Sequence, residues 1–373
     1  HAVRASVLTR SSGGGGVSGA ASTRAAALRA RAVVPWLTET ERDRTNLALV
    51  NAGGSEDGPI TLHVTVSSGD PAVPGLVELP DVVLPPGGFH QLNRVLLASG
   101  LPSRIGWARI RRVSGNAPYL AWATVNDAVT GDGSIVAAFP DDAASTGPLT
   151  FPAAVQGGRY TTELVLTNPR EVGVQATVSL SGSGSFVQPL APYETFYVED
   201  LVAETRRRGL PGAPPAGAPF VGEVVVNGAV GGLRVSTTGE DGRFGVFEPP
   251  IATEAKSVVL PDLRRDASTR TNLAVVNGYG FGGPHVFRLE IHDGDTPRLA
   301  ASTEITLERG ARLQLDDVLR SLAPSVVRGW ARVVPSLPTY FSAYAVVMDG
   351  AVPGEGPDDG AFVPGVPEES ATR

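Results

Sequence analysis

The chain has 373 residues, with 45 glycines, 31 prolines, no cysteine and a formal net charge of −7. Charged residues make up 18% of the sequence and hydrophobic residues 42%, which excludes a disordered polyelectrolyte, a coiled coil and a small disulfide-linked fold. Frequent turn residues between short apolar segments indicate an all-β fold, and the modest charge does not favour nucleic acid as a partner.

Residues 1–34 form the first predicted segment, a basic arm with a glycine-rich linker. Residues 1–38 contain five arginines and no acidic residue. Near its start the arm has the alternation of a strand, which would pair with an open sheet edge of another copy of the chain. The predicted subunit-contact residues are Val3, Arg4, Ala5, Val7, Leu8 and Arg10. A frayed terminus or a spacer is the alternative interpretation of the same segment.

An internal repeat follows the arm. Residues 44–51 read RTNLALVN, residues 270–277 read RTNLAVVN, and a weaker copy, TTELVLTN, spans residues 161–168. A second landmark follows each of these octamers, namely GWARI at 106–110, GEVVV at 222–226 and GWARV at 329–333. A repeat of roughly 110 residues is too long for a solenoid unit and has the size of a complete domain. We therefore predict three tandem domains, at 35–148, 149–255 (divergent) and 256–366, followed by a C-terminal tail at 367–373.

Each repeat has the residue pattern of an antiparallel β-sandwich. Polar and apolar residues alternate over 60–66, 174–180 and 286–292, as expected for strands with one buried face. Apolar patches at 92–98 and 315–322 predict a short helix between the two sheets. This arrangement resembles the tandem Ig-like or fibronectin-type-III-like domains of bacterial secreted and surface structural proteins. The resemblance implies scaffolding, adhesion or assembly, and it leaves the strand topology open because the cysteine pair of antibody-type domains is absent.

The sequence shows no pattern typical of an enzyme site. None of the five histidines forms a closely spaced pair, and neither a cysteine nor a Gly-x-Ser-x-Gly elbow is present, so we predict no catalytic residue, no metal site and no cofactor. Acidic Asp-Gly segments such as 293–295 are interpreted as turns rather than calcium loops. An N-terminal histidine can chelate copper in sandwich-type oxidative enzymes, but His1 begins a glycine-linked arm, which makes a copper enzyme the least favoured hypothesis.

Two tryptophans share one position of the repeat. Trp107 and Trp330 occupy it in the outer domains, and Glu223 occupies it in the middle domain. Equivalent strand positions favour packing within or between domains, whereas sugar stacking, together with Tyr119, Trp122, Tyr340 and Tyr344, is the alternative.

These observations predict a secreted or cell-surface, non-enzymatic structural protein. No run of about 18 apolar residues is present, so no membrane-spanning helix is expected. The absence of cysteine and the start at His1 rather than Met are typical of an exported chain with its leader removed, although a truncated chain would look the same. The predicted partner is the protein itself, in an extracellular filament or surface layer whose arm contacts the next subunit. The alternative is an adhesin or carbohydrate-binding protein that recognises cell-surface polysaccharide.

Overall fold

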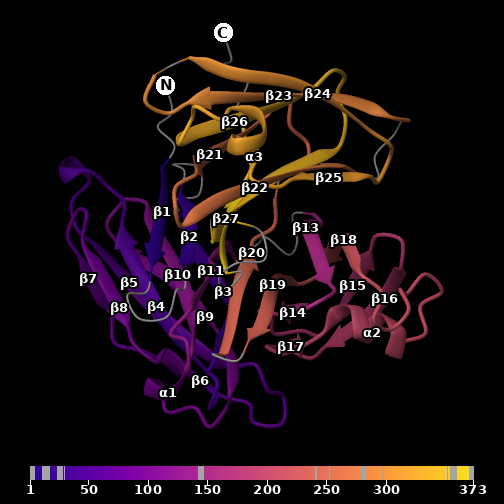
Figure 1. Ribbon diagram of the computed structural model, residues 1–373. Helices are drawn as coiled ribbons and strands as arrows, with labels where there is room; N and C mark the ends of the chain where they lie inside the picture. The colour runs from indigo at the N-terminus through magenta and orange to yellow at the C-terminus, as the bar shows by residue number, and fades with distance from the viewer. Residues whose placement is uncertain are drawn as a thin grey trace. The chain divides into compact units, whose positions relative to one another are not determined.

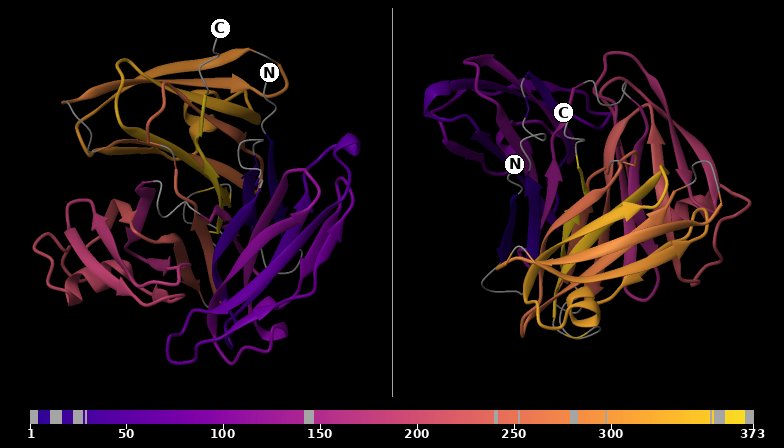
Figure 2. Two further views of the ribbon diagram at one scale, coloured as in Figure 1. Left: turned by 180° about the vertical axis from the view of Figure 1, so that it is seen from behind. Right: turned by 90° about the horizontal axis from the view of Figure 1, so that it is seen from above.

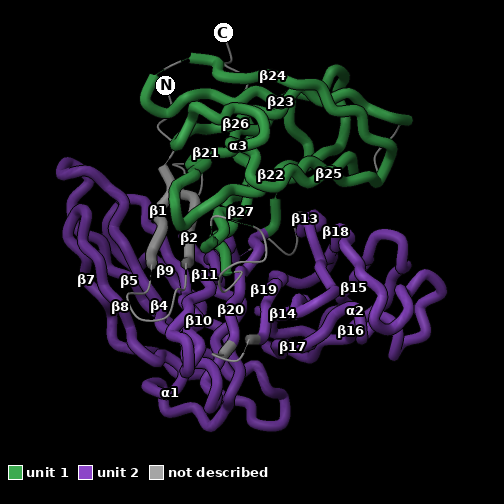
Figure 3. Tube along the Cα trace, in the orientation of Figure 1, with its two compact units in different colours: residues 1–22, 250–373 green, residues 23–249 purple. Residues whose placement is uncertain are grey.

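The structure is a computed structural model, and it describes residues 5–10, 17–22, 28, 30–141, 147–239, 242–251, 253–278, 283–296, 298–350, 352 and 359–368. Nearly all described elements are antiparallel strands, seen from one side in Figure 1 and from two others in Figure 2. The predicted all-β, sandwich-type fold is therefore confirmed. The chain divides into two compact units, residues 1–22 with 250–373 and residues 23–249 (Figure 3).

The unit of residues 23–249 contains two sandwiches. The first sandwich consists of β3 (Arg31–Thr38), β4 (Asp43–Asn51), a 3₁₀ turn (Ser55–Asp57), β5 (Ile60–Ser68), β6 (Leu76–Glu78), β7 (Val82–Leu84), β8 (Phe89–Leu92), α1 (Val95–Ala98), β9 (Ile105–Ser114), β10 (Tyr119–Asp127), β11 (Gly133–Ala137) and β12 (Phe139–Pro140). The second sandwich consists of β13 (Leu149–Gln156), β14 (Tyr160–Thr167), β15 (Val174–Leu180), β16 (Gly184–Leu190), β17 (Thr195–Val198), α2 (Leu201–Arg207), β18 (Phe220–Asn227), β19 (Val230–Gly239) and β20 (Gly242–Glu248).

The other unit contains the third sandwich and the strands of the arm. The arm has β1 (Ala5–Arg10) and β2 (Val17–Ser22), which pair with each other antiparallel. The third sandwich consists of β21 (Val258–Arg264), β22 (Thr269–Asn277), β23 (His285–Asp293), β24 (Leu299–Leu307), β25 (Arg312–Leu315), α3 (Val318–Leu322), β26 (Arg328–Pro335), β27 (Phe341–Asp349), β28 (Gly360–Pro364) and β29 (Val366–Pro367).

All three sandwiches have the same topology. In the second sandwich the sheets have the strand orders β13-β18-β15-β16 and β17-β14-β19-β20. The equivalent strands of the first sandwich have the orders β3-β9-β5-β6 and β8-β4-β10-β11, and those of the third have β21-β26-β23-β24 and β25-β22-β27-β28. Counted without β7, the sixth strand is β9, β18 and β26 in the three sandwiches, and a short helix precedes each of them. The sequence predicts this helix in the first and third sandwiches. The repeat read from the sequence is thus a repeat of tertiary structure.

The first strand of each sandwich carries the same irregularity. Its pairing with the sixth strand shifts by a β-bulge, and the bulge contains Pro35, Pro152 and Pro261 in the three sandwiches. Proline lacks a backbone N–H and is tolerated in a sheet mainly at bulges and edges. The three prolines are spaced as the octamers are, so they form a third landmark that the sequence offers.

Two residues of each octamer hold the sandwich together. The hydroxyls of Thr45, Thr162 and Thr271 bond both the backbone N–H and the carbonyl oxygen of a residue at the end of the first strand, at 2.7 to 2.9 Å. Since the first and second strands lie in different sheets, this hydroxyl links the two sheets. The last residue of each octamer, Asn51, Asn168 and Asn277, donates its side-chain amide to a backbone carbonyl at or directly after the end of another strand.

The arm is shorter than the sequence predicts. The expected boundary at residue 34 lies inside β3, and Ala32, Val33 and Val34 are fully buried. Val3 and Arg4 lie outside the described residues, whereas Ala5, Val7, Leu8 and Arg10 lie on β1, for which the structure describes the backbone alone. β1 pairs with β2 of its own chain, so contact of these residues with another subunit stays a prediction.

Candidate functional site

The first and second sandwiches share a buried surface, called here the internal interface. Val165 and Phe247 of the second sandwich belong to the hydrophobic core of the first. Trp36, in the bulge of β3, stacks on both Tyr197 and Phe247, with ring centroids 5.9 and 6.2 Å away. The sheet of β14 and β19 is therefore covered on both faces, which explains why these strands lack a clear burial alternation.

A tryptophan and a turn form one edge of this interface. Trp107 on β9 is fully buried, its ring stacks on Tyr193 with centroids 6.1 Å apart, and its indole N–H donates to the Tyr193 carbonyl oxygen at 3.0 Å. Beside it, Arg109 donates to the Pro169 carbonyl oxygen at 2.6 Å and pairs with Asp141. The GWAR segment of the first repeat is thus an interdomain contact, and the packing interpretation of Trp107 is correct.

The backbone of Tyr193 has a conformation that usually belongs to glycine. Its φ is 65°, and the equivalent turn residues of the other two sandwiches are Gly87 and Gly310, with φ of 69° and 73°. A side chain in this left-handed region costs roughly 1–2 kcal/mol. The second sandwich therefore has a strained backbone at Tyr193, the residue whose ring covers Trp107.

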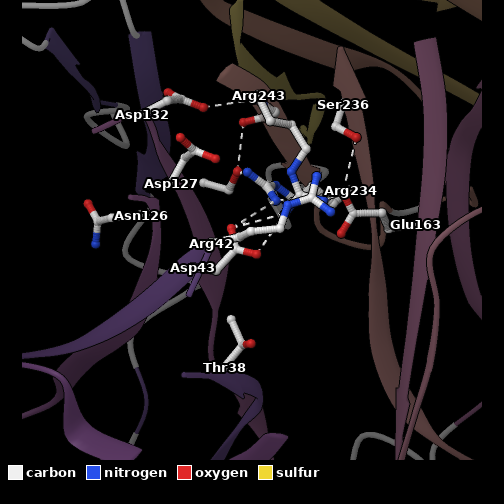
Figure 4. Close-up of polar contacts among 12 residues, drawn as sticks. Thr38, Arg42, Asp43, Asn126, Asp127, Asp132, Glu163, Arg234, Ser236 and Arg243 are labelled. Carbon is white, nitrogen blue, oxygen red and sulfur yellow. Dashed lines mark hydrogen bonds and ion pairs between the residues drawn. The ribbon is translucent and has the colours of Figure 1, made fainter. Parts of the chain in front are cut away.

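A cluster of buried charges lies at the centre of the interface (Figure 4). Asp43 of the first sandwich accepts two hydrogen bonds from Arg243 of the second, at 2.8 and 3.0 Å. Glu163 lies 3.2 Å from Arg243, and Arg234 lies 3.6 Å from both carboxylates. Two acids and two arginines thus neutralise one another, which a buried charge requires.

Hydroxyl and backbone groups complete the cluster. Arg234 is fully buried and donates through Nε to the Ser134 hydroxyl at 2.8 Å, which in turn donates to the Gly245 carbonyl oxygen. Glu163 accepts from Tyr197 and Ser236 at 2.9 and 3.0 Å. Burial and the charge of Glu163 raise the pKa of Tyr197 well above its usual value, so this hydroxyl remains a donor.

Glycine makes room for the buried arginine. A Cβ on Gly245 would lie 2.5 Å from Arg234 Nε, and one on Gly232 would lie 2.0 Å from the Phe247 ring. These close approaches show that the side chains around Arg234 are tightly packed. The arrangement can fix the register of the two sandwiches.

Sequence reasoning missed Glu163 as a functional residue. In the first and third sandwiches its position is held by Asn46 and Asn272, whose side-chain oxygens accept from the backbone N–H of Arg94 and Asp317. Those two N–H groups belong to left-handed residues that precede α1 and α3. Asp200, before α2, is extended and caps the helix with its own side chain, so the second sandwich needs no such asparagine. A charged residue in the middle of an otherwise uncharged strand was the available signal.

The other aromatic candidates are dispersed. Trp330 is half-buried on β26 and stacks on His292, with centroids 3.8 Å apart and the rings nearly parallel. Trp122 packs beside Phe89 on the outer face of the first sandwich. Tyr340 borders a cleft of about 570 Å³ in the third sandwich, together with Glu254, Lys256 and residues 335–339. Tyr119 and Tyr344 are buried, and among the described residues no ring contact is recorded between Trp330 and Tyr340.

Glu223 lies on β18 at the position equivalent to the two tryptophans. Burial raises the pKa of its carboxyl to about 7. Within the described residues no ion pair or hydrogen bond of this carboxylate is recorded, so burial alone accounts for the shift.

A second cleft, of about 430 Å³, borders the charge cluster and is lined by both acidic and basic residues, among them Glu39, Asp43 and Arg94.

Across the described part of the chain, no group of three or more histidine or acidic side chains is arranged to hold a metal ion. The same residues include no helix long and apolar enough to cross a membrane. No protein-family model matches the chain, and no curated protein is significantly similar to it.

Proposed function

We propose that this protein is a secreted, non-enzymatic structural protein that assembles with itself into an extracellular filament or surface layer, in which the N-terminal arm contacts the next subunit. The observation that supports this proposal is the internal interface. Four buried ionisable groups, Asp43 of the first sandwich and Glu163, Arg234 and Arg243 of the second, hold one sandwich against the other. A repeated sandwich that binds its own kind is the element from which an assembly is built.

The test is the assembly state of the full chain and of a variant that lacks residues 1–22. The deletion ends at residue 22 because Leu28 and β3 belong to the core of the first sandwich. In sedimentation velocity and negative-stain images, we expect the full chain to form larger particles as its concentration rises. The shortened chain should form smaller particles at the same concentrations. Monodisperse monomers of the full chain at every concentration would contradict the proposal.

An adhesin that binds polysaccharide is the second candidate, and the cleft beside Tyr340 favours it. The ring is 39% exposed, and its neighbour Leu337 is 64% exposed. Glu254 bonds the Tyr340 hydroxyl and raises its pKa, which fixes the ring at the rim of the cleft. Glycan binding that is lost in Tyr340→Ala and kept in Trp122→Ala would support this candidate.

A further inference from the structure

The internal interface has two halves, and a copy of each half occurs elsewhere in the chain. The donor half is the GWAR segment of the sixth strand with the bulged first strand beside it, both from the first sandwich. The acceptor half is the outer face of the sheet β17-β14-β19-β20 and the turn at Tyr193, both from the second sandwich.

The third sandwich carries the copy of the donor half. Residues 329–332 repeat residues 106–109 letter for letter, and Trp330 and Arg332 lie on β26 as Trp107 and Arg109 lie on β9. Trp107 is fully buried, whereas Trp330 is half-buried, and among the described residues no hydrogen-bond partner is recorded for its indole N–H. His292 covers one face of the indole. The N–H of this half-buried side chain is free to donate to a group of another chain.

The first sandwich carries the copy of the acceptor half. The outer face of its sheet β8-β4-β10-β11 presents apolar side chains that are half-buried or exposed. Phe89 is the most exposed of them, at 57%. This face consists of Val50, Phe89, Leu120, Trp122 and Ile135. The strand register places these residues where the second sandwich has Thr167, Thr195, Val230, Gly232 and Phe247, which the first sandwich covers. The apolar face of the first sandwich is thus the exposed counterpart of a covered one.

The turn beside this face has the backbone conformation that the indole N–H needs. Gly87 occupies the position of Tyr193, and the two φ angles, 69° and 65°, agree closely. The Gly87 turn can therefore present a carbonyl oxygen to a tryptophan in the same manner as Tyr193 presents its own to Trp107.

Each pair of surfaces has one tryptophan, which lies in the bulge in the internal interface and on the facing sheet in the copies. In the internal interface the bulge presents Trp36, and the facing sheet has Gly232. In the copies the bulge of β21 presents Asp262, and the facing sheet has Trp122. One tryptophan at the centre is retained in both cases, contributed by opposite partners, so the volume to be filled is conserved.

We propose that the Trp330 face of the third sandwich docks onto the apolar face of the first sandwich of a second copy of this chain. The indole N–H of Trp330 donates to the turn at Gly87, and β21 covers Phe89 and Trp122. Because the two surfaces differ, each copy has one of each free, and the contact extends into an open chain. This inference rests on the proposed self-assembly and adds this pair of surfaces to the contact made by the N-terminal arm.

The experiment uses two single variants of the full chain and their mixture. Phe89→Glu disables the acceptor face and leaves the Trp330 face intact, and Trp330→Ala does the reverse. We expect each variant alone to associate at least on the order of tenfold more weakly than the unmodified chain, since central aromatic residues dominate such interfaces. In chains that also lack residues 1–22, so that the arm adds no contact, an equimolar mixture should form dimers and nothing larger, because it contains one intact face of each kind. Val83→Glu and Leu337→Ala, at sites 66% and 64% exposed, are the matched controls.

Three results would overturn the inference. If the full chain assembles and both variants assemble equally well, the proposed surfaces are wrong while the proposed self-assembly stands. If the mixture remains monomeric although each variant is impaired, the contact is not between two different faces. If the unmodified chain is monomeric throughout, both the inference and the proposed function fail. Thermal melting of each variant checks its fold, and Trp330→Phe, which removes the N–H donor with a smaller change of volume, replaces Trp330→Ala if the latter unfolds.

Discussion

Glu163 lies directly opposite Arg234 in the register of β14 and β19, and both side chains are almost completely buried at the contact with the first sandwich. Arg243 adds a second positive charge beside this pair, and Asp43 supplies the negative charge that balances it. Asp43 comes from the first sandwich and the other three residues from the second. Charge balance in this cluster therefore depends on the two sandwiches being together.

Glu163→Gln should destabilise the protein by about 3–5 kcal/mol, because it leaves two buried arginines facing one carboxylate. The measurement is the free energy of unfolding in urea. Glu199→Gln is the control: its ion pair with Arg42 is exposed on both sides, and such pairs contribute about 0–1 kcal/mol. Equal effects of the two substitutions would show that the buried cluster does not stabilise the interface.

Trp107→Phe should cost more than Trp36→Phe by about 1 kcal/mol, although both change a buried tryptophan of the same interface. Trp107 donates an indole hydrogen bond to the Tyr193 carbonyl oxygen, which the substitution leaves unpaired. The indole N–H of Trp36 has no partner within the described residues, so its removal breaks no bond. Urea unfolding of the two variants compares the costs. A larger cost for Trp36→Phe would mean that shape, and not this hydrogen bond, dominates the contact.

Much of the fold could be predicted from sequence, because the residues that build each sandwich recur in all three copies. The octamer threonine and the final asparagine bond backbone groups of their own sandwich, so every copy needs them. The interface could not be predicted in the same way. Trp107 and Trp330 lie in identical four-residue segments, but only Trp107 is fully buried. The burial of a residue that faces away from its own core depends on what covers that face of the sheet.

The charge cluster shows the same limit for distant residues. Asp43 and Arg243 are bonded across 200 positions of the chain, and no local pattern connects them. The middle repeat diverges in sequence from the other two, and the sequence alone gives no reason for this divergence. Glu163 and Tyr193 show that at least part of this divergence serves contacts within the chain.

Replacement of Tyr193 should separate backbone strain from ring contact. Tyr193→Ala loses the ring over Trp107 and keeps a side chain at φ 65°, whereas Tyr193→Gly loses the same ring and relaxes the backbone. We therefore expect Tyr193→Gly to be more stable than Tyr193→Ala, by about 1 kcal/mol. Gly310→Ala, at φ 73° in the third sandwich, should show a loss of similar size without any ring. Thermal or urea unfolding of the three variants provides the comparison. Equal stability of the two Tyr193 variants would indicate that this turn is not strained.

Glu223 should make the protein less stable as the pH rises through the weakly acidic range. Burial raises the pKa of Glu223 to about 7 from the ordinary value of 4.5, so between these two pH values the folded chain binds more protons than the unfolded chain. The free energy of unfolding must then fall by on the order of 2 kcal/mol as the pH rises from 4.5 to 7, and level off above 7.

Glu223→Gln removes the ionisation, so the difference in stability between this variant and the unmodified chain isolates the effect from all other titrating groups. We expect this difference to favour Glu223→Gln by more at pH 8 than at pH 5 in urea unfolding. Glu304→Gln, at an exposed position of β24, should show no such change with pH. A difference that is independent of pH would show that the carboxyl of Glu223 is hydrated in the folded protein.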